Sequence, residues 1–369
     1  MTTKDSLIAY RRDLAVALNN QFQRLALNNF AVAYPTGRAQ AFTGVDIEAL
    51  RLEIADLKDE AVSRLDQLFL AFKEKATAAG VQVHVAETAA QANEIIIQIA
   101  AASGVTKVVK GKSMTAEEIH LNPHLEAQGL EVTETDLGEW IIQLRREGPS
   151  HMVLPAIHLS RHQVAELFSE VTGQLQGDDV ARLVKVARRE LRAKFAQADM
   201  GITGANFAIA ETGTIGLVTN EGNARLVATL PRVHVALIGL EKLTPNLQNA
   251  LTVLKALPRN ATGQAISSYV TWITGRNACA AAPDGLKQMH MIFLDNGRRA
   301  LAKDPVLSTA LRCIRCGACA NVCPIYRLVG GHKYGHVYIG AIGLILTYVY
   351  HGRTPAQNLV RNCLNCGAC

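Results

Sequence analysis

The segment Cys313-Ile314-Arg315-Cys316-Gly317-Ala318-Cys319-Ala320-Asn321-Val322-Cys323-Pro324 carries four cysteines in the spacing Cys-x2-Cys-x2-Cys-x3-Cys-Pro. This spacing matches the bacterial ligand run for iron–sulfur clusters residue for residue. Three thiolates within seven residues can bind three irons of one cubane, and the small residues Gly317 and Ala318 let the backbone approach the sulfides. The fourth cysteine lies beyond a turn, where Pro324 ends the run. We call this segment the first cysteine run.

A second cysteine run, Cys363-x2-Cys366-x2-Cys369, repeats the first three ligands 50 residues later. In two-cluster ferredoxins the fourth cysteine of each run binds the other cluster, so Cys323 is expected to complete the cluster of the second run. The predicted cluster ligands are Cys313, Cys316, Cys319, Cys323, Cys363, Cys366 and Cys369.

By the same rule, the cluster of the first run needs a cysteine about four residues beyond Cys369. We interpret the sequence as a fragment that lacks its C-terminus. The alternative is a three-cysteine site completed by water or by a partner protein. Zinc is the alternative metal, but it needs four ligands, typically in two separated pairs, so two three-cysteine runs fit it poorly. The sequence therefore predicts two 4Fe-4S clusters, one of which lacks a ligand in the sequence as given.

The composition of the whole chain is that of a globular protein of about two domains: 369 residues, 49% hydrophobic and 19% charged. This composition excludes a disordered tail protein, a collagen-like repeat and a charge-rich coiled coil. The absence of an evident export signal places the protein in the cytoplasm, where eight cysteines indicate metal or redox chemistry rather than disulfides. Cys279, among alanines, is expected to be a small buried side chain.

The positive charge is concentrated near the cysteines. The residues from Cys313 onward include five Lys or Arg and no Asp or Glu, which leaves about +1 of the net +6 for residues 1–312. No basic cluster typical of a nucleic-acid surface occurs in the large domain. The basic tail is instead expected to balance negative clusters. The longest apolar stretch near the tail, 337–350, is shorter than the ~18 residues of a membrane span.

The remainder of the chain alternates between strand-like and helix-like patterns, which favours a mainly parallel α/β sheet with both faces covered. Asp46 is the expected N-cap of one long amphipathic helix, and Thr115 with Glu118 a capping box. A hairpin is expected over 207–219. The expected strands are 81–85, 107–111, 130–135, 152–154, 233–238, 269–273 and 291–294, and the expected helices are 46–79, 88–103 and 178–199.

A candidate small-molecule site surrounds the turn of the hairpin, where exposed backbone N–H groups could hold an anion. It consists of Glu211, Thr212, Gly213, Asn220 and Glu221. The alternative is that these polar groups only satisfy loop backbone.

Two further motifs are weaker. Gly111-Lys112-Ser113 resembles the end of a phosphate-binding P-loop, but Thr106 stands where that loop needs glycine. The pairs His332/His336 and His158/His162 are each four residues apart but lack the glutamate of a zinc protease. Ordinary surface or core histidines are expected at these positions.

The sequence resembles the lactate utilisation protein B family of iron–sulfur proteins over essentially its whole length. The resemblance rests on segments that include Gly204–Gly213, Asn220–Asn223, Glu241-Lys242, Pro155–His158, Asp295–Arg298 and Gly330-Gly331-His332.

The resemblance implies a fold and a domain order. The fold is a large three-layer α/β domain similar to the sugar-phosphate isomerase and CoA-transferase fold, followed by a helical two-cluster ferredoxin module. The expected divisions are a helical region at 1–75, the lactate-utilisation domain at 76–300 and the incomplete ferredoxin-like domain at 301–369. The sequence departs from the family pattern because the last Cys-Pro is missing.

The resemblance also implies a function. The chain would be an electron-transfer subunit that helps oxidise lactate to pyruvate. It would act with other subunits of a complex or with a flavin lactate dehydrogenase, and would reach the membrane only through such partners. No catalytic residue in the large domain is implied. The alternative is a small-molecule-binding or CoA-transferase-like enzyme or sensor whose ferredoxin serves another oxidoreductase.

Overall fold

The structure is a computed structural model that describes residues 3–331, 334 and 336–369. His332 and Lys333, which belong to the sequence motifs above, lie outside the described residues.

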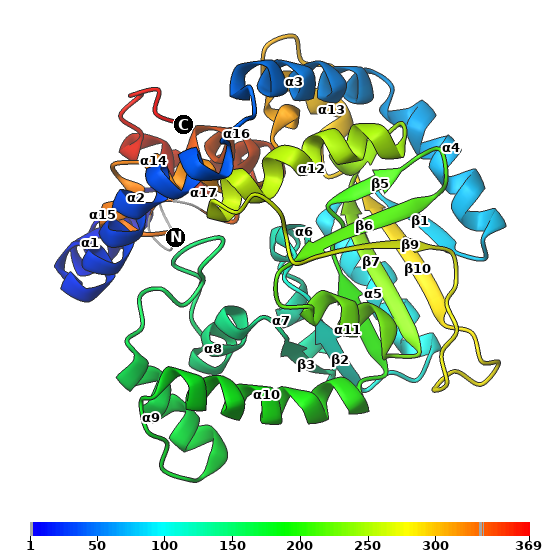
Figure 1. The fold of residues 1–369 in the computed structure, drawn as a ribbon, viewed down its shortest axis with the longest axis horizontal. Helices are drawn as coiled ribbons and strands as arrows, with labels where there is room; N and C mark the ends of the chain where they lie inside the picture. Colours follow the sequence, from blue (N-terminus) through cyan, green and yellow to red (C-terminus); the bar gives the residue numbers. More distant parts are fainter. Residues whose placement is uncertain (1–2, 332–333, 335) are drawn as a thin grey trace.

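A six-stranded parallel sheet forms the centre of the large domain (Figure 1), as the strand–helix alternation predicts. The strand order is β1-β10-β7-β4-β2-β3, and all neighbours pair in parallel. The strands are β1 Gln82–Ala86, β2 Lys107–Lys110, β3 Glu131–Glu134, β4 Met200–Thr203, β7 Val233–Gly239 and β10 Gln288–Leu294.

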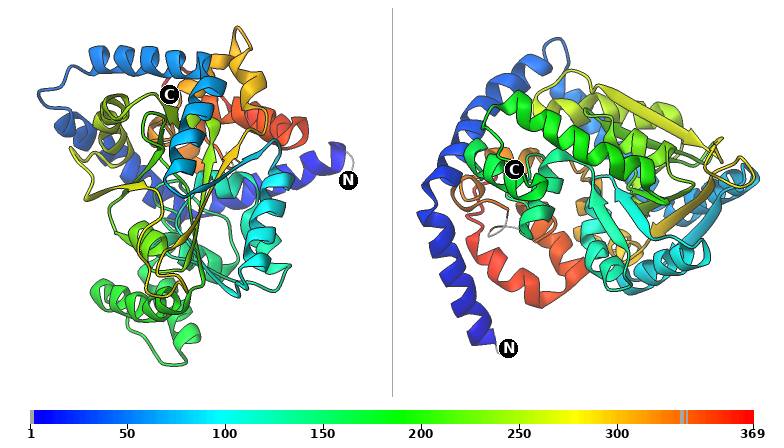
Figure 2. Two further views of the ribbon diagram at one scale, coloured as in Figure 1. Left: turned by 90° about the vertical axis from the view of Figure 1, so that its right-hand side faces the viewer. Right: turned by 90° about the horizontal axis from the view of Figure 1, so that it is seen from below.

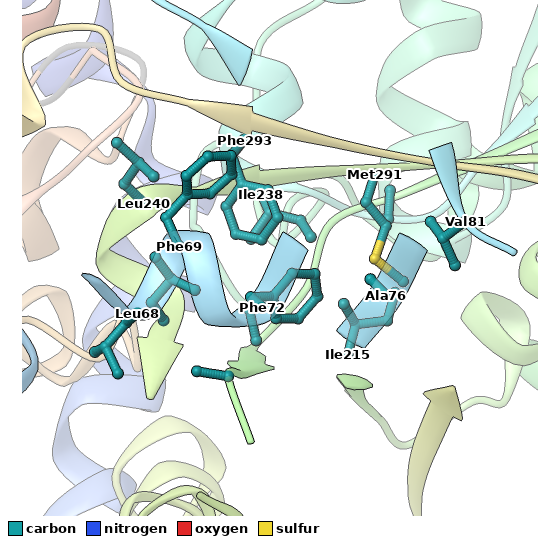
Figure 3. Close-up of a cluster of buried hydrophobic side chains, with 14 of the residues drawn as sticks. Leu68, Phe69, Phe72, Ala76, Val81, Ile215, Ile238, Leu240, Met291 and Phe293 are labelled. Carbon is teal, nitrogen blue, oxygen red and sulfur yellow. The ribbon is translucent and has the colours of Figure 1, made fainter. Parts of the chain in front are cut away.

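Both faces of this sheet are buried, and alternate residues of each strand serve different faces. On β10, Met291 and Phe293 pack into one hydrophobic cluster, and Ile292 and Leu294 pack into another. In the first cluster the ring of Phe72 meets Phe293 edge to face, with centroids 4.9 Å apart (Figure 3). The central strands β7 and β10 are therefore mostly apolar, which is why the sequence pattern predicts them.

A smaller mixed sheet covers part of one face, with strand order β8-β5-β6-β9. Its strands are β5 Phe207–Ile209, β6 Thr214–Thr219, β8 Leu243–Thr244 and β9 Tyr269–Thr274. Strands β5 and β6 form the predicted antiparallel hairpin. Strand β9 is partly exposed rather than buried as predicted, because it lies at the edge of this sheet.

Helices pack on the faces of the sheets, and further helices make up the C-terminal tail, the residues from Cys313 onward. Their bounds are α1 Thr3–Asn19, α2 Gln21–Ala41, α3 Ile47–Ser63, α4 Leu65–Ala78, α5 Ala89–Ala102, α6 Met114–Glu118, α7 Leu121–Glu126, α8 Leu137–Arg145, α9 Arg161–Thr172, α10 Val180–Gln197, α11 Asn223–Thr229, α12 Leu247–Thr262, α13 Arg298–Ala302, α14 Ala318–Val322, α15 Tyr326–Val329, α16 Gly340–His351 and α17 Arg353–Leu359. Short 3₁₀ helices are η1 Leu240–Lys242, η2 Leu307–Arg312 and η3 Val360–Asn362. Within the described part of the chain, none of the helices combines the length and the hydrophobicity needed to cross a bilayer.

Local sequence signals predict most of these strands but only some of the helices, and three of the predictions are wrong in detail. Asp46 is the N-cap of α3, but the predicted single helix breaks at Arg64 into α3 and α4. The cap of α6 is Ser113, whose side chain accepts a hydrogen bond from Ala116, and not Thr115. The segment 152–154 is not a strand.

The N-terminal helices α1 and α2 contact the C-terminal part of the chain. Helices α1 and α2 lie along the cysteine-rich tail (Figure 2), where Ala17 and Leu27 share a hydrophobic cluster with Tyr326 and Val329. Gln23 Nε2 donates to the backbone oxygen of Val329 at 2.8 Å. The tail is therefore assembled from both ends of the described chain.

Candidate iron–sulfur centre

The two cysteine runs adopt the same backbone conformation. Each begins directly after a 3₁₀ helix, η2 or η3. Two positions in each run have positive φ: Arg315 (62°) and Gly317 (79°) in the first, and Asn365 (51°) and Gly367 (72°) in the second. Successive turns of this kind make backbone concavities that bind anions and iron–sulfur groups. The internal sequence repeat is therefore also a structural repeat.

Five of the cysteines line one cavity of about 270 Å³ in the tail. They include Cys323 from the first run together with Cys363, Cys366 and Cys369 from the second, and Cys319 lies at the same cavity. All seven predicted ligands are free thiols. The four cysteines predicted to share a cluster therefore lie around one cavity.

The backbone beside Cys319 leaves no room for another side chain. A Cβ added to Gly340, which has a φ of +75°, would lie 2.6 Å from Cys319 Sγ. Burial raises the pKa of Cys316 to about 11 and that of Cys319 to about 12, so the thiols stay protonated without nearby positive charge. Cysteines that held a cluster would be deprotonated, because a thiol bound to a metal ion loses its proton and the irons would supply the positive charge. The residues present thus fit an iron–sulfur group.

A buried charge network joins the first cysteine run to the large domain. Arg298 donates to both carboxylate oxygens of Glu118, at 2.9 and 2.7 Å, and also to Glu241. Arg315 pairs with Glu241 at 3.2 Å and lies over the ring of Tyr338. Burial opposes ionisation of Glu241, but the two guanidiniums outweigh it and hold its pKa well below the usual range. We call these four charged residues the Arg298 network.

Two more cations lie beside this balanced network. Lys58 donates to the backbone oxygen of Glu241, and a small pocket separate from the cysteine cavity is lined by Lys58, Lys242 and Cys313. Burial lowers the pKa of Lys58, and it lowers that of Lys242 to about 8. The charge next to Cys313 therefore comes largely from outside the tail. Of the tail's own basic residues, Arg315 is already paired with Glu241, and Arg353 and Arg361 are exposed.

A second cavity lies where the topology of the sheet reverses. Strand β3 lies on one side of β2 and β4 on the other, and open α/β sheets bind ligands at the carboxyl ends of strands at such a point. The cavity, of about 130 Å³, is lined by Lys112 after β2, by Gly204 after β4, and by Lys242 and Arg315. We call it the switch-point cavity. The Gly111-Lys112-Ser113 motif lies here.

The structure does not bring the five residues of the predicted small-molecule site together. Glu211, Thr212 and Gly213 precede β6, and Asn220 and Glu221 follow it, so roughly 20 Å of strand separates the two groups. An added Cβ on Gly213 would lie 2.4 Å from the backbone of Ala76 in α4. Asn220 donates to Gln264 at 2.7 Å and accepts from the Ser268 N–H.

Cys279, His158 and His162 have ordinary environments, as the sequence predicts. Cys279 is buried as predicted. His158 bonds Glu147 at 2.9 Å, and His162 lies 3.0 Å from Asp178. Sequence reasoning did not place Lys58 or Lys242 beside Cys313, because both are distant from it in the sequence; Glu241-Lys242 enters only as a segment of the family resemblance.

An α/β domain with a parallel sheet, followed by a helical domain with two cysteine runs, defines a class of iron–sulfur proteins. Residues 70–294 match the LUD domain, and residues 309–369 match the 4Fe-4S dicluster domain. The chain belongs to the lactate utilisation protein B family of LUD-domain proteins.

Relatives include lactate utilization protein B of Bacillus subtilis, 38% identical over all of this chain and 77% of the relative. The protein of that name from Oceanobacillus iheyensis is 40% identical over the same shares of the two chains. The uncharacterized electron transport protein YkgF of Escherichia coli is 42% identical over 87% of this chain and 67% of its own. A solved DUF162 family protein from Deinococcus radiodurans aligns with a TM-score of 0.36 and 16% identity, over 62% of this chain and 98% of its own.

Proposed function

We propose that this chain is an iron–sulfur electron-transfer subunit of a lactate-oxidising system in the cytoplasm. The seven cysteines would hold two 4Fe-4S clusters, which supply one-electron carriers. Oxidation of lactate to pyruvate releases two electrons and two protons, so two such carriers can accept both electrons. The oxidation itself belongs to a partner, either another subunit or a flavin lactate dehydrogenase. The names of the relatives, which refer to lactate utilisation and electron transport, support this proposal.

The observation that carries the proposal is the position of Cys323 among the cysteines of the second run. This position supports an exchange of the fourth ligand between the two runs, as in two-cluster ferredoxins, whose clusters are close enough to pass electrons. A zinc module would not require it.

Anaerobic iron and sulfide analysis tests the cluster assignment. Two cubanes correspond to about eight irons and eight sulfides per chain. Cys323→Ser is expected to lower both contents toward half and to remove one set of reduced-cluster EPR signals. Cys279→Ala, which removes a buried thiol outside the runs, should leave both unchanged. A colourless protein that contains zinc would contradict the assignment.

Growth tests the physiological part of the proposal. Deletion of the gene should abolish growth on lactate but not on pyruvate, and the Cys323→Ser gene should fail to restore it. Unchanged growth of the deletion strain on lactate would contradict a role in lactate oxidation.

The second candidate function is the binding of a small anion by the large domain. The switch-point cavity favours it, because Lys112, Lys242 and Arg315 line a cavity at the usual ligand position of such a sheet. Calorimetry of the full chain with lactate, pyruvate and a sugar phosphate tests this function. Binding that is lost in Lys112→Met would support it, and no heat from any of the three would contradict it.

A further inference from the structure

Three histidines from distant parts of the sequence meet at one place outside the cysteine cavity. The ligand nitrogens of His120, His336 and His351 all lie within 4.8 Å of one another. The ring centroids of His336 and His351 are 4.4 Å apart, and that of His120 is 5.5 and 5.6 Å from theirs. Within the described ranges, no other such set of three ligand residues occurs. We call this group the three-histidine cluster.

The cluster connects the two parts of the molecule. His120 belongs to the large domain, at the left-handed turn (φ 50°) between α6 and α7. His351 is the last residue of α16, and His336 lies in the segment before that helix. A bond to all three side chains would therefore join the tail to the large domain.

Buried contacts with the Arg298 network hold the three segments that carry these histidines. Glu118, two residues before His120, accepts a hydrogen bond from the hydroxyl of Tyr338, two residues after His336. The ring of Tyr350, next to His351, lies 4.2 Å from the guanidinium carbon of Arg298. The backbone that carries the three imidazoles is thus held in place by buried contacts, which pre-organises the cluster.

One of the three imidazoles has a buried nitrogen that lacks a hydrogen-bond partner among the described residues. This nitrogen is His351 Nε2, and buried polar groups normally have such a partner. His120 and His336 are exposed, so an ion can reach the cluster from solvent.

We propose that the three-histidine cluster binds a divalent transition-metal ion, with zinc as the expected metal, and thereby links the tail to the large domain. Three imidazoles with an open fourth position for water are an established tetrahedral zinc site. In such a site the ligand nitrogens are about 3.4 Å apart, so small side-chain rotations from the observed positions suffice. The site is separate from the cysteines, whose soft thiolates hold the iron–sulfur groups.

Zinc K-edge X-ray absorption of the full chain, with its clusters reconstituted and one equivalent of Zn²⁺ added, tests the proposal. We expect nitrogen ligands at about 2.0–2.1 Å, and not the sulfur at about 2.3 Å that zinc on the cysteines would give. Competition titration with a zinc chelator should show one site per chain, and iron and sulfide contents should not change.

Two variants change only exposed side chains, so a loss of zinc binding in them does not result from a failure to fold. His120→Ala and His336→Ala should each weaken zinc binding at least ~10-fold, and zinc should no longer raise the melting temperature of either variant. His162→Ala, which removes an exposed histidine that pairs with Asp178, should bind zinc as the wild type does. Sulfur ligands in the spectrum, or equal zinc affinity in His120→Ala and wild type, would overturn the proposal.

Discussion

At the scale of single residues, Arg298 has the largest expected effect on stability. Its side chain is fully buried and holds two buried carboxylates, Glu118 and Glu241. Breaking a buried ion pair by removing one partner typically costs about 3–5 kcal/mol, because an unpaired charge remains. We expect Arg298→Ala to lower the free energy of unfolding by at least this amount, as measured by urea denaturation.

The control for this prediction is an arginine whose ion pair is exposed. Arg312 binds both carboxylate oxygens of Asp59, but both side chains are more than 40% exposed. Exposed pairs contribute about 0–1 kcal/mol, so Arg312→Ala should change the stability little. Equal losses in the two variants would show that the Arg298 network does not stabilise the fold as its burial indicates.

The buried side chain of His234 is expected to make the free energy of unfolding depend on pH. It lies fully buried in β7, and burial, with Lys287 and His290 nearby, lowers its pKa to about 3. In the unfolded chain the imidazole gains a proton below about pH 6.5, whereas the folded chain resists protonation. Above pH 6.5 the imidazole is neutral in both states and does not lower the free energy of unfolding. As the pH falls from 6.5 toward 3, only the unfolded chain gains the proton, so the free energy of unfolding decreases.

Between pH 7 and pH 5, His234 alone should account for a loss of about 2 kcal/mol. His234→Gln cannot gain the proton, so its urea unfolding should depend less on pH by about this amount. His162→Gln, on the surface, should retain the wild-type dependence. An unchanged pH dependence in His234→Gln would contradict the prediction.

At the scale of elements, the start of α16 tests the space around Cys319. Gly340 and Gly352 bound this helix, with φ values of +75° and +82°. Another residue at either position is strained by about 1–3 kcal/mol. Only at Gly340 would the new Cβ also meet a cysteine, because nothing lies within 4 Å of the Cβ position at Gly352.

We therefore expect Gly340→Ala to lose iron and sulfide and Gly352→Ala to keep both, at a similar strain in the backbone. Iron and sulfide analysis with visible absorption measures the difference. Equal cluster contents in the two variants would show that the contact with Cys319 is unimportant.

Elements whose signals are local are predicted well from the sequence. The buried strands β7 and β10 are mostly apolar, and the cap Asp46 acts on its own helix. The break at Arg64 is not predictable in this way, because the apolar stripe continues through it and the change of direction follows from packing on the sheet. The segment 152–154 was misjudged because its apolar residues pack beside the tail, where Met152 joins the cluster around Tyr326.

At the scale of the whole molecule, cations of the large domain should set a redox property of the tail. Lys58 and Lys242 lie near Cys313, and positive charge favours the reduced state of a cluster. We expect Lys58→Met and Lys242→Met each to shift the reduction potential of one cluster to more negative values. The shift should be on the order of tens of millivolts, which is the effect of one partly screened charge.

Redox titration followed by EPR measures this shift. Lys255→Met, on the exposed side of α12, is the control and should leave both potentials unchanged. If Lys58→Met and Lys242→Met behave like this control, the two lysines do not influence the cluster.

Whether a site residue can be predicted depends on whether its signal is local in the sequence or arises only in the fold. The cysteines stand within two short runs, so their spacing alone identifies them. Lys58, Lys242 and the three histidines are assembled from distant segments, and only the fold brings them together. The predicted residues around β6 failed to converge for the opposite reason, since neighbours in sequence lie at opposite ends of one extended strand.

The contact between α2 and α15 has a consequence for the order of events during synthesis. Gln23 and Val329 are 306 residues apart, and a ribosome adding 5–20 residues per second needs roughly 15–60 s to pass from one to the other. Over that interval the residues of α2 that contact α15, such as Gln23 and Leu27, cannot make this contact, so the two ends of the described chain are joined late in synthesis.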